Sequence, residues 1–205
     1  MKKKKISFKN ANLILRFLKK NITNLPIIDN NRNNKVREEI LHKLIGSVLT
    51  DDERALSFGF PKGCRVREGA KIFNIENLDI GEYCWIGENA ILDASGGLKI
   101  GKHCSIGPSV FIWSHTSHLT NLAMKNKINS NLIKRKKTEI GDGCFIAGPS
   151  VILPGVKIGS KVLVRPFSTV TKNIPDNSLV DGSTIKRNVF TQKFIDFQIK
   201  KIKND

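Results

Sequence analysis

The sequence predicts an all-β fold, a parallel β-helix, and three observations lead to this prediction. Aliphatic residues recur every six positions over most of residues 80–170, and each begins a six-residue unit, or hexad. Glycine directly follows six of these leading aliphatic residues, at positions 81, 87, 101, 107, 141 and 159. A small or β-branched residue stands four positions after most of them. A six-residue period fits neither an amphipathic helix nor a plain alternating strand, and it indicates hexads of one short strand and one corner. The leading aliphatic residues are Ile80, Ile86, Leu92, Ile100, Ile106, Ile112, Ile140, Ile146, Ile152, Ile158, Val164 and Val170.

Each position of the hexad has a structural reason. Three hexads make one triangular coil, in which the leading aliphatic residue points inward and the glycine permits the corner. Stacked coils are about 4.8 Å apart, the spacing of strands in a sheet. Cys84, Cys104 and Cys144 share the small position of the hexad, so we interpret them as packing residues.

No metal site is expected. The four cysteines form no C-x-x-C pair. His103 and His115 are separated by two hexads rather than by a full coil, so their side chains do not stack.

The repeat breaks twice, and both breaks fall at the same corner of the predicted prism. The step from Leu92 to Ile100 is eight positions instead of six, with "SGG" at 95–97 forming a bulge. After Ile112 the pattern resumes only at Ile140, which leaves an excursion over residues 118–139. Long excursions from compact repeats are usually functional. This edge is therefore the predicted site.

The stretch "FIWSH" places His115 at that edge, immediately before the excursion. Beside it we expect Gly96–Gly97 on one coil and Pro154–Gly155 on the other, which would leave the imidazole accessible as a general base for a sugar hydroxyl. A corner histidine bonded to a carbonyl is the alternative. His118 is interpreted either as an acceptor contact or as a plain loop residue. Asp93, one coil away, would orient a histidine, accept from a sugar hydroxyl, or be a solvated acid.

The flanking segments divide the chain into three parts. Residues 1–62 form a basic, partly helical N-terminal region, with a helix over residues 36–48 capping the first coil. Residues 63–185 form the β-helix. Residues 186–205 form an amphipathic C-terminal helix that we expect to lie on the prism.

The net charge of +17 indicates anionic partners or surroundings. Much of this charge lies in residues 1–20, which contain no acid, and in the excursion. The N-terminal arm is either a solvated or trimer-packed tail, or a peripheral contact with a membrane surface. No apolar stretch reaches about twenty residues and no export signal is recognised, so we expect a cytoplasmic protein, with the inner face of the membrane as the arm's alternative location.

Residues 63–187 resemble the hexapeptide-repeat acyltransferases, most closely the galactoside, maltose and polysaccharide O-acetyltransferases. The resemblance rests on the I-G-x-x-x-x hexads, "IGPSVFIWSH", the excursion, "IGDGCFIAGPSVILPGVKIG" and "VTKNIPDNSLVDGS". It implies a left-handed β-helix assembled as a homotrimer, with acetyl-CoA in the groove between two prisms. It also implies direct acetyl transfer to a glycan hydroxyl, with His115 as the base.

The resemblance completes the predicted site. Acceptor contacts are assigned to His118, Asp93, Trp113 and Phe145, the last standing where relatives often carry tryptophan. "VRPF" at 164–167 replaces the usual "IGAG" beside the pantetheine path. The basic excursion suggests an anionic or lipid-phosphate-linked acceptor. Acetyl-CoA contacts are assigned to Ala147, Gly148, Arg165, Pro166, Thr171, Lys172 and Lys186.

Three other functions remain open. N-acetyl transfer to an amino sugar is the nearest, because the same base can serve an attacking amine. A non-catalytic β-helix is opposed by His115 in its expected surroundings. A nucleic-acid-binding protein is motivated only by the charge, since the chain has no recognised nucleic-acid module or basic motif interleaved with aromatics.

Overall fold

The computed structural model describes residues 33, 48–124 and 130–204. The chain divides into two units, residues 1–49 and residues 50–205, and all the helices and strands named below belong to the second. The predicted basic arm over residues 1–20 and most of the predicted helix over residues 36–48 lie outside the described residues.

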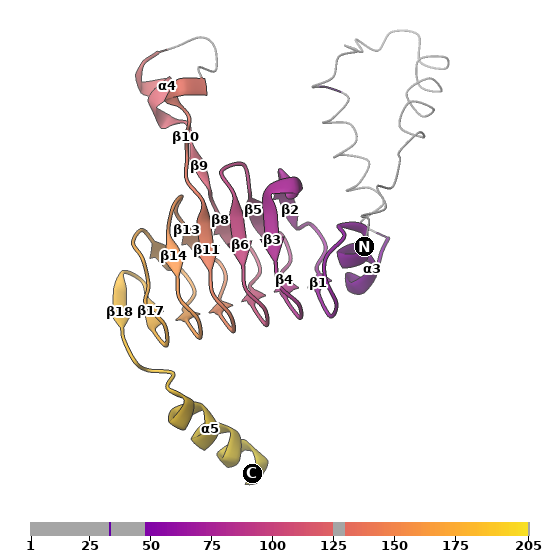
Figure 1. The fold of residues 1–205 in the computed structure, drawn as a ribbon, viewed down its shortest axis with the longest axis vertical. Helices are drawn as coiled ribbons and strands as arrows, with labels where there is room; N and C mark the ends of the chain where they lie inside the picture. The colour runs from indigo at the N-terminus through magenta and orange to yellow at the C-terminus, as the bar shows by residue number, and fades with distance from the viewer. Residues whose placement is uncertain (1–32, 34–47, 125–129, 205) are drawn as a thin grey trace. The chain divides into compact units, whose positions relative to one another are not determined.

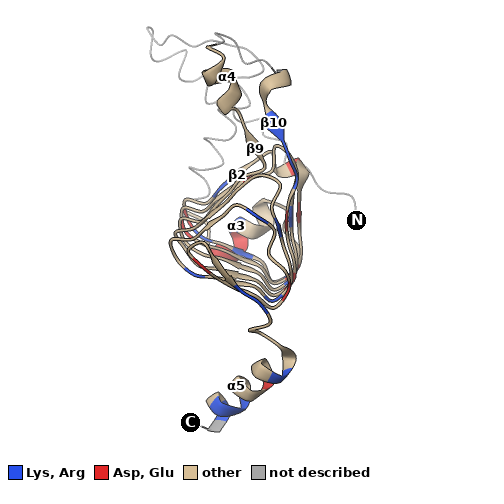
Figure 2. Cartoon of the chain, turned by 90° about the vertical axis from the view of Figure 1, so that its left-hand side faces the viewer, with Lys and Arg blue, Asp and Glu red and all other residues tan. Residues whose placement is uncertain are grey.

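Three parallel sheets form the walls of a triangular prism, as Figure 2 shows end-on. Each sheet is named here by its first strand. The β1 sheet contains β1 (Arg65–Val66), β4 (Trp85–Ile86), β7 (Ser105–Ile106), β12 (Phe145–Ile146), β15 (Leu163–Val164), β17 (Leu179–Asp181) and, antiparallel at its end, β18 (Thr184–Lys186). The β2 sheet contains β2 (Lys71–Phe73), β5 (Ile91–Asp93), β8 (Phe111–Ile112), β13 (Val151–Ile152) and β16 (Thr169–Val170). The β3 sheet contains β3 (Leu78–Ile80), β6 (Leu98–Ile100), β11 (Thr138–Ile140) and β14 (Lys157–Ile158).

The strand register confirms the hexad assignment. Ile80 pairs with Ile100, which pairs with Ile140, so leading aliphatic residues stack on one another from coil to coil. The same holds on the β2 sheet for Leu92 and Ile112. The three sheets therefore line one shared core, in which Leu92, Ile100, Ile112 and Ile140 are at most 1% exposed. Ile80 packs against this core but is only partly buried.

The cysteines form a buried ladder at the corner between the β3 and β1 sheets. The thiols of Cys84, Cys104 and Cys144 each donate to a glycine carbonyl of the next coil at 3.0 Å. Cys64 extends the ladder, and burial raises the pKa of its thiol. The interpretation of the cysteines as packing residues is confirmed.

A helix at the start of the second unit was not predicted. Helix α3 (Asp51–Ser57) begins with a capping box between Thr50 and Glu53. It buries Ala55 and Arg54, and the Arg54 guanidinium donates to the Val66 carbonyl of the first coil. Helix α3 therefore covers the first coil of the solenoid.

A C-terminal helix forms, but it begins at Gln192 rather than at the predicted residue 186, which ends strand β18, and most of its apolar side chains are exposed. Helix α5 (Gln192–Asn204) leaves Phe197 63% and Ile202 74% exposed, and Phe194 and Ile199 are also exposed. The expectation that this face packs on the prism is wrong for these side chains. Among the described residues, no helix is both long enough and apolar enough to cross a membrane.

The excursion contains its own short elements. β9 (His115–Thr116) and β10 (Lys134–Arg135) pair antiparallel and leave the prism side by side (Figure 1). Beyond them lie α4 (His118–Leu122) and the 3-10 helix η2 (Ser130–Leu132). A second 3-10 helix, η1 (Ile75–Asn77), connects β2 to β3. The excursion thus begins as an ordered ribbon that extends the corner between the β2 and β3 sheets.

Candidate active site

Both breaks of the repeat lie at the corner between the β2 and β3 sheets, as predicted. The glycines there have a different role from the expected one. A Cβ on Gly96 would lie 2.1 Å from the Ser114 carbonyl oxygen, and a Cβ on Gly155 would lie 3.0 Å from the Lys136 side chain. These glycines therefore allow the two strands of the excursion to pass close to the corner, rather than clearing space for an imidazole.

His115 is held at this corner by two side chains of the preceding coil. Its Nδ1 lies 2.7 Å from Asp93 Oδ2 and 2.8 Å from Ser95 Oγ. The side chain is 33% exposed, so the ring is fixed along one edge and open to solvent at another. The partners of Nδ1 are side chains, so the alternative of a histidine bonded to a backbone carbonyl does not hold for this nitrogen.

Asp93 is fully buried at the end of β5. Its Oδ2 accepts from the Ser114 backbone N–H at 2.9 Å and the His115 backbone N–H at 3.1 Å, and its Oδ1 accepts from the Ser95 N–H at 3.0 Å. Burial alone would raise the pKa of this carboxyl, but the hydrogen bonds from Ser95, Ser114 and His115 outweigh it and lower the pKa to about 2. Asp93 is thus a buried carboxylate, and this geometry favours the orienting role over contact with a sugar.

The charge on Asp93 selects the tautomer of His115. A carboxylate only accepts hydrogen bonds, so Nδ1 of the imidazole carries the proton that points at Asp93. Nε2 then presents a lone pair, and no described side chain forms a hydrogen bond or ion pair with it. The pair can therefore accept a proton at Nε2 while Asp93 stabilises the resulting imidazolium.

Two further predicted residues lie near the pair. The ring of Trp113 meets the ring of His115 edge-on, with centroids 6.3 Å apart. His118, the first residue of α4, is exposed, and its Nδ1 lies 2.8 Å from Thr116 Oγ1. Trp113 thus lies at one side of the imidazole, and His118 begins the helix that follows β9.

Sequence reasoning missed Ser95 and Ser114. Ser114 Oγ donates to Asp93 Oδ2 at 3.2 Å and accepts from the Gly96 N–H at 2.8 Å. The sequence predicts the bulge at 95–97, but not the contact of Ser95 with the imidazole. The signal that could have found both is a serine at each break of the repeat, beside the aspartate and the histidine.

The residues assigned to acetyl-CoA divide between two corners of the prism. Thr171 and Lys172 follow β16 at the corner that His115 occupies. Ala147, Gly148, Arg165 and Pro166 lie at the other end of the β2 sheet, at its corner with the β1 sheet. Phe145, assigned to the acceptor, is on the β1 sheet itself. Lys186 ends β18. Within one chain the structure brings only part of this set to the His115 corner.

Three residues at the second corner have individual constraints. A Cβ on Gly148 would lie 1.6 Å from the Pro108 carbonyl oxygen, so this position requires glycine. Arg165 is exposed and forms an ion pair with Asp181 at 3.0 Å. Pro166 has no backbone N–H, so it cannot donate to a ligand from that position.

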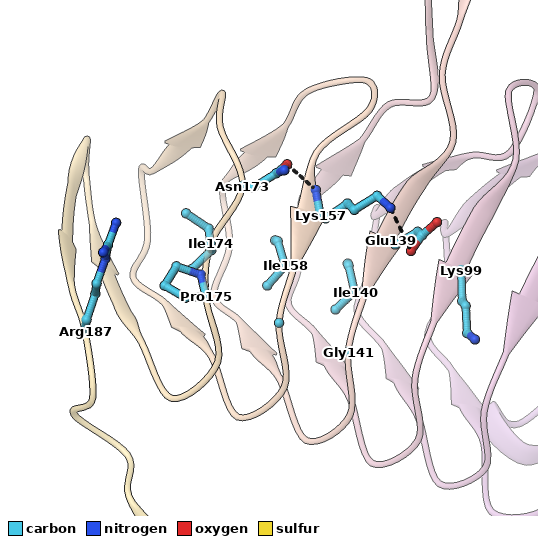
Figure 3. Close-up of a pocket in the computed structure, with 11 residues that line it drawn as sticks. Lys99, Glu139, Ile140, Gly141, Lys157, Ile158, Asn173, Ile174, Pro175 and Arg187 are labelled. Atoms are coloured by element: carbon cyan, nitrogen blue, oxygen red, sulfur yellow. Dashed lines mark hydrogen bonds and ion pairs between the residues drawn. The ribbon is translucent and has the colours of Figure 1, made fainter.

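A shallow cleft of about 530 Å³ lies on the β3 sheet (Figure 3). Lys157 reaches across it toward Glu139, at 3.9 Å, and the Lys157 N–H donates to Asn173 Oδ1 at 2.9 Å. Lys99 and Arg187 add positive charge. The cleft does not include His115. Among the described residues, no three His, Cys, Asp or Glu side chains cluster as metal ligands.

Comparison with known proteins agrees with this architecture. The model of the family "Bacterial transferase hexapeptide (six repeats)" matches residues 137–172, which follow the excursion directly. Residues 137–172 thus match this family's hexapeptide repeat. The resemblance to hexapeptide-repeat acyltransferases that the sequence predicted is therefore confirmed.

Two curated relatives of this chain are acetyltransferases by name. WcaF of Escherichia coli (strain K12), named for colanic acid biosynthesis, is 29% identical over 60% of this chain and 63% of its own length. A galactoside O-acetyltransferase of Lactococcus lactis is 28% identical over 60% of this chain and 58% of its own length. The matched region thus spans less than two thirds of either relative.

Solved structures share the fold. A hexapeptide-repeat containing acetyltransferase of Vibrio cholerae superposes with a TM-score of 0.64 and 25% identity, covering 75% of this chain and 90% of its own. A maltose O-acetyltransferase of Clostridium difficile superposes with a TM-score of 0.53 and 21% identity, covering 74% and 84%. This chain therefore shares the fold of these proteins over about three quarters of its length.

Proposed function

We propose that this chain is an acetyl-CoA-dependent O-acetyltransferase that acts on a hydroxyl of a sugar or polysaccharide. The observation that carries the proposal is the His115–Asp93 pair, which presents a free Nε2 at the corner where the repeat breaks. The names of the relatives, a galactoside O-acetyltransferase and a colanic acid biosynthesis acetyltransferase, support a sugar acceptor.

The proposed chemistry assigns one task to each residue of the pair. Acetyl-CoA supplies the acetyl group as a thioester. His115 Nε2 removes the proton of the acceptor hydroxyl as its oxygen forms the new bond to the carbonyl carbon. The proton then passes from Nε2 to the departing sulfur as the C–S bond breaks. Asp93 stabilises the intermediate imidazolium through its contact with Nδ1.

The residues assigned to acetyl-CoA fit an anionic co-substrate. Lys172 and Lys186 are both exposed, and phosphate groups favour such side chains. Arg187, next to Lys186, adds positive charge. The Gly148 backbone N–H is assigned to the developing oxyanion. Because Gly148 and His115 lie at different corners, we propose that the complete site forms between two chains of a homotrimer, with one corner from each.

Acetyl transfer tests the proposal directly. The protein is incubated with acetyl-CoA and a panel of capsular and lipopolysaccharide glycans, each with its amino-sugar counterpart, and added acetyl groups are detected by mass spectrometry. Acetylation of hydroxyls that depends on His115 is the expected result. Acetylation of amines alone would make the chain an N-acetyltransferase. Thermal stabilisation by DNA but not by acetyl-CoA would contradict an acyltransferase function of either kind.

A further inference from the structure

The second strand of the excursion places basic side chains beside His115. β10 pairs with β9 so that Arg135 is directly opposite His115 and Lys134 is opposite Thr116. Residues directly opposite in an antiparallel pair project to the same face, with Cβ atoms about 4.5–5.5 Å apart. The Lys136 N–H donates to the Ser114 carbonyl at 2.8 Å and fixes the ribbon against the corner. Arg135 therefore shares a face of the ribbon with the imidazole.

The charge of this strand is largely uncompensated. Lys134, Arg135, Lys136 and Lys137 are consecutive and exposed, and β10 appears as a blue segment above the prism in Figure 2. The sequence has no Asp or Glu from residue 115 to residue 138. Lys137 pairs with Glu139 at 3.5 Å, but among the described residues no carboxylate pairs with Lys134, Arg135 or Lys136.

The fold does not require these charges. The ribbon is held by backbone pairing and by the close approach of Lys136 to Gly155, for which the lysine ammonium is unnecessary. Adjacent like charges repel one another and disfavour the ordered ribbon. A ligand that brings negative charge to the face shared with His115 would remove this repulsion, and a guanidinium binds phosphate or carboxylate through two parallel hydrogen bonds.

We propose that β10 forms an anion subsite, in which Arg135 binds a phosphate or carboxylate group of the acceptor while His115 acts on its hydroxyl. This inference rests on the proposed function for the role of His115 and adds the substrate class: an acidic or phosphate-bearing sugar rather than a neutral one. Lys134 and Lys136 supply the surrounding positive field.

The test is a set of calorimetric titrations with three glucose derivatives: glucose 1-phosphate, glucuronic acid and methyl glucoside. CoA is present throughout, so that the sugar anions do not occupy the phosphate contacts of CoA. The variant is Arg135→Gln, which keeps the backbone pairing of β10. The matched control is Arg65→Gln, because Arg65 is an exposed strand arginine on the β1 sheet, away from the His115 corner.

The expected result is that at least one anionic sugar binds more tightly than methyl glucoside. Arg135→Gln should weaken that binding about tenfold, as the loss of a charge-assisted hydrogen bond does, while Arg65→Gln leaves it unchanged. The tighter of the two anionic sugars identifies the group recognised.

Three results would overturn the subsite: neither anionic sugar binds, methyl glucoside binds as tightly as both, or the two variants behave alike. Failure of the proposed function is seen separately, as a protein that does not bind CoA or transfer acetyl groups. In that case the same titrations without CoA still decide whether Arg135 binds the anion.

Discussion

Asp93 Oδ2 lies 2.7 Å from His115 Nδ1, although the two residues belong to consecutive coils and are separated by the whole of β6, β7 and β8. The contact exists because the hexad register stacks the end of β5 beneath the end of β8. The repeat therefore places the buried Asp93 carboxylate against His115 Nδ1. A proton held on Nδ1 leaves Nε2 with a lone pair that can accept a proton.

Replacing the carboxylate by an amide should slow transfer without preventing binding. In Asp93→Asn the side-chain amide no longer selects the Nδ1–H tautomer, so we expect acetyl transfer to fall about 10²–10⁴-fold. Acetyl-CoA affinity, measured by calorimetry, should remain unchanged. The matched control is Asp79→Asn, an exposed acid on β3 that should keep full activity. Equal acetyl-transfer activities of Asp93→Asn and Asp79→Asn would contradict the orienting role of Asp93.

The low pKa of Asp93 also predicts a specific pH dependence of stability. Because folding lowers the pKa of this carboxyl from about 4 to about 2, its stabilising contribution is fully present above pH 4 and is lost as pH falls from about 4 to about 2. The contribution amounts to about 2 kcal/mol. Urea unfolding of the wild type and Asp93→Asn at several pH values measures it. The difference in free energy of unfolding between the two proteins should become smaller as the pH falls from about 4 to about 2. A difference that stays constant would show that the Asp93 charge does not contribute this stability.

A site shared between chains predicts complementation. Phe145 is 47% exposed on β12, two residues before Ala147 of the second corner, so Phe145→Asp should fold while placing a negative charge beside that corner and disrupting it. The two variants, His115→Ala and Phe145→Asp, are assembled together in equal amounts. About a quarter of the interfaces should then pair an intact His115 corner of one chain with an intact second corner of its neighbour. The mixture should therefore have acetyl-transfer activity that neither variant has alone. Sedimentation should give three times the chain mass. A monomer in solution, or no recovery on mixing, would contradict the shared site.

The period of the sequence was sufficient to predict most of the fold, because a hexad fixes both which side chains point inward and which residues stack. The pairings of Ile80 with Ile100 and of Leu92 with Ile112 follow from counting alone. The same counting placed Asp93 one coil from His115. Where the period is interrupted, counting no longer applies, so the orientation of Ser95 and the close contacts at Gly96 were not predictable from it.

The ends of the solenoid were harder to predict for a different reason. Helix α3 is only 7 residues long and carries no extended apolar periodicity, although its capping box at Thr50 and Glu53 is a recognisable start signal. The apolar pattern of α5 predicted a helix correctly, but such a pattern does not say what the apolar face contacts, and Phe197 and Ile202 remain exposed.

The most direct test of the account compares His115→Ala with His118→Ala in steady-state kinetics on the acceptor identified by mass spectrometry. His115→Ala should lower kcat about 10²–10⁴-fold with folding and acetyl-CoA affinity unchanged, because it removes the imidazole that the Asp93 carboxylate orients as a base. His118→Ala should mainly raise KM for the acceptor, since His118 is exposed and contacts Thr116 rather than Asp93. Loss of turnover in His118→Ala, together with near wild-type turnover in His115→Ala, would contradict the assignment of the base.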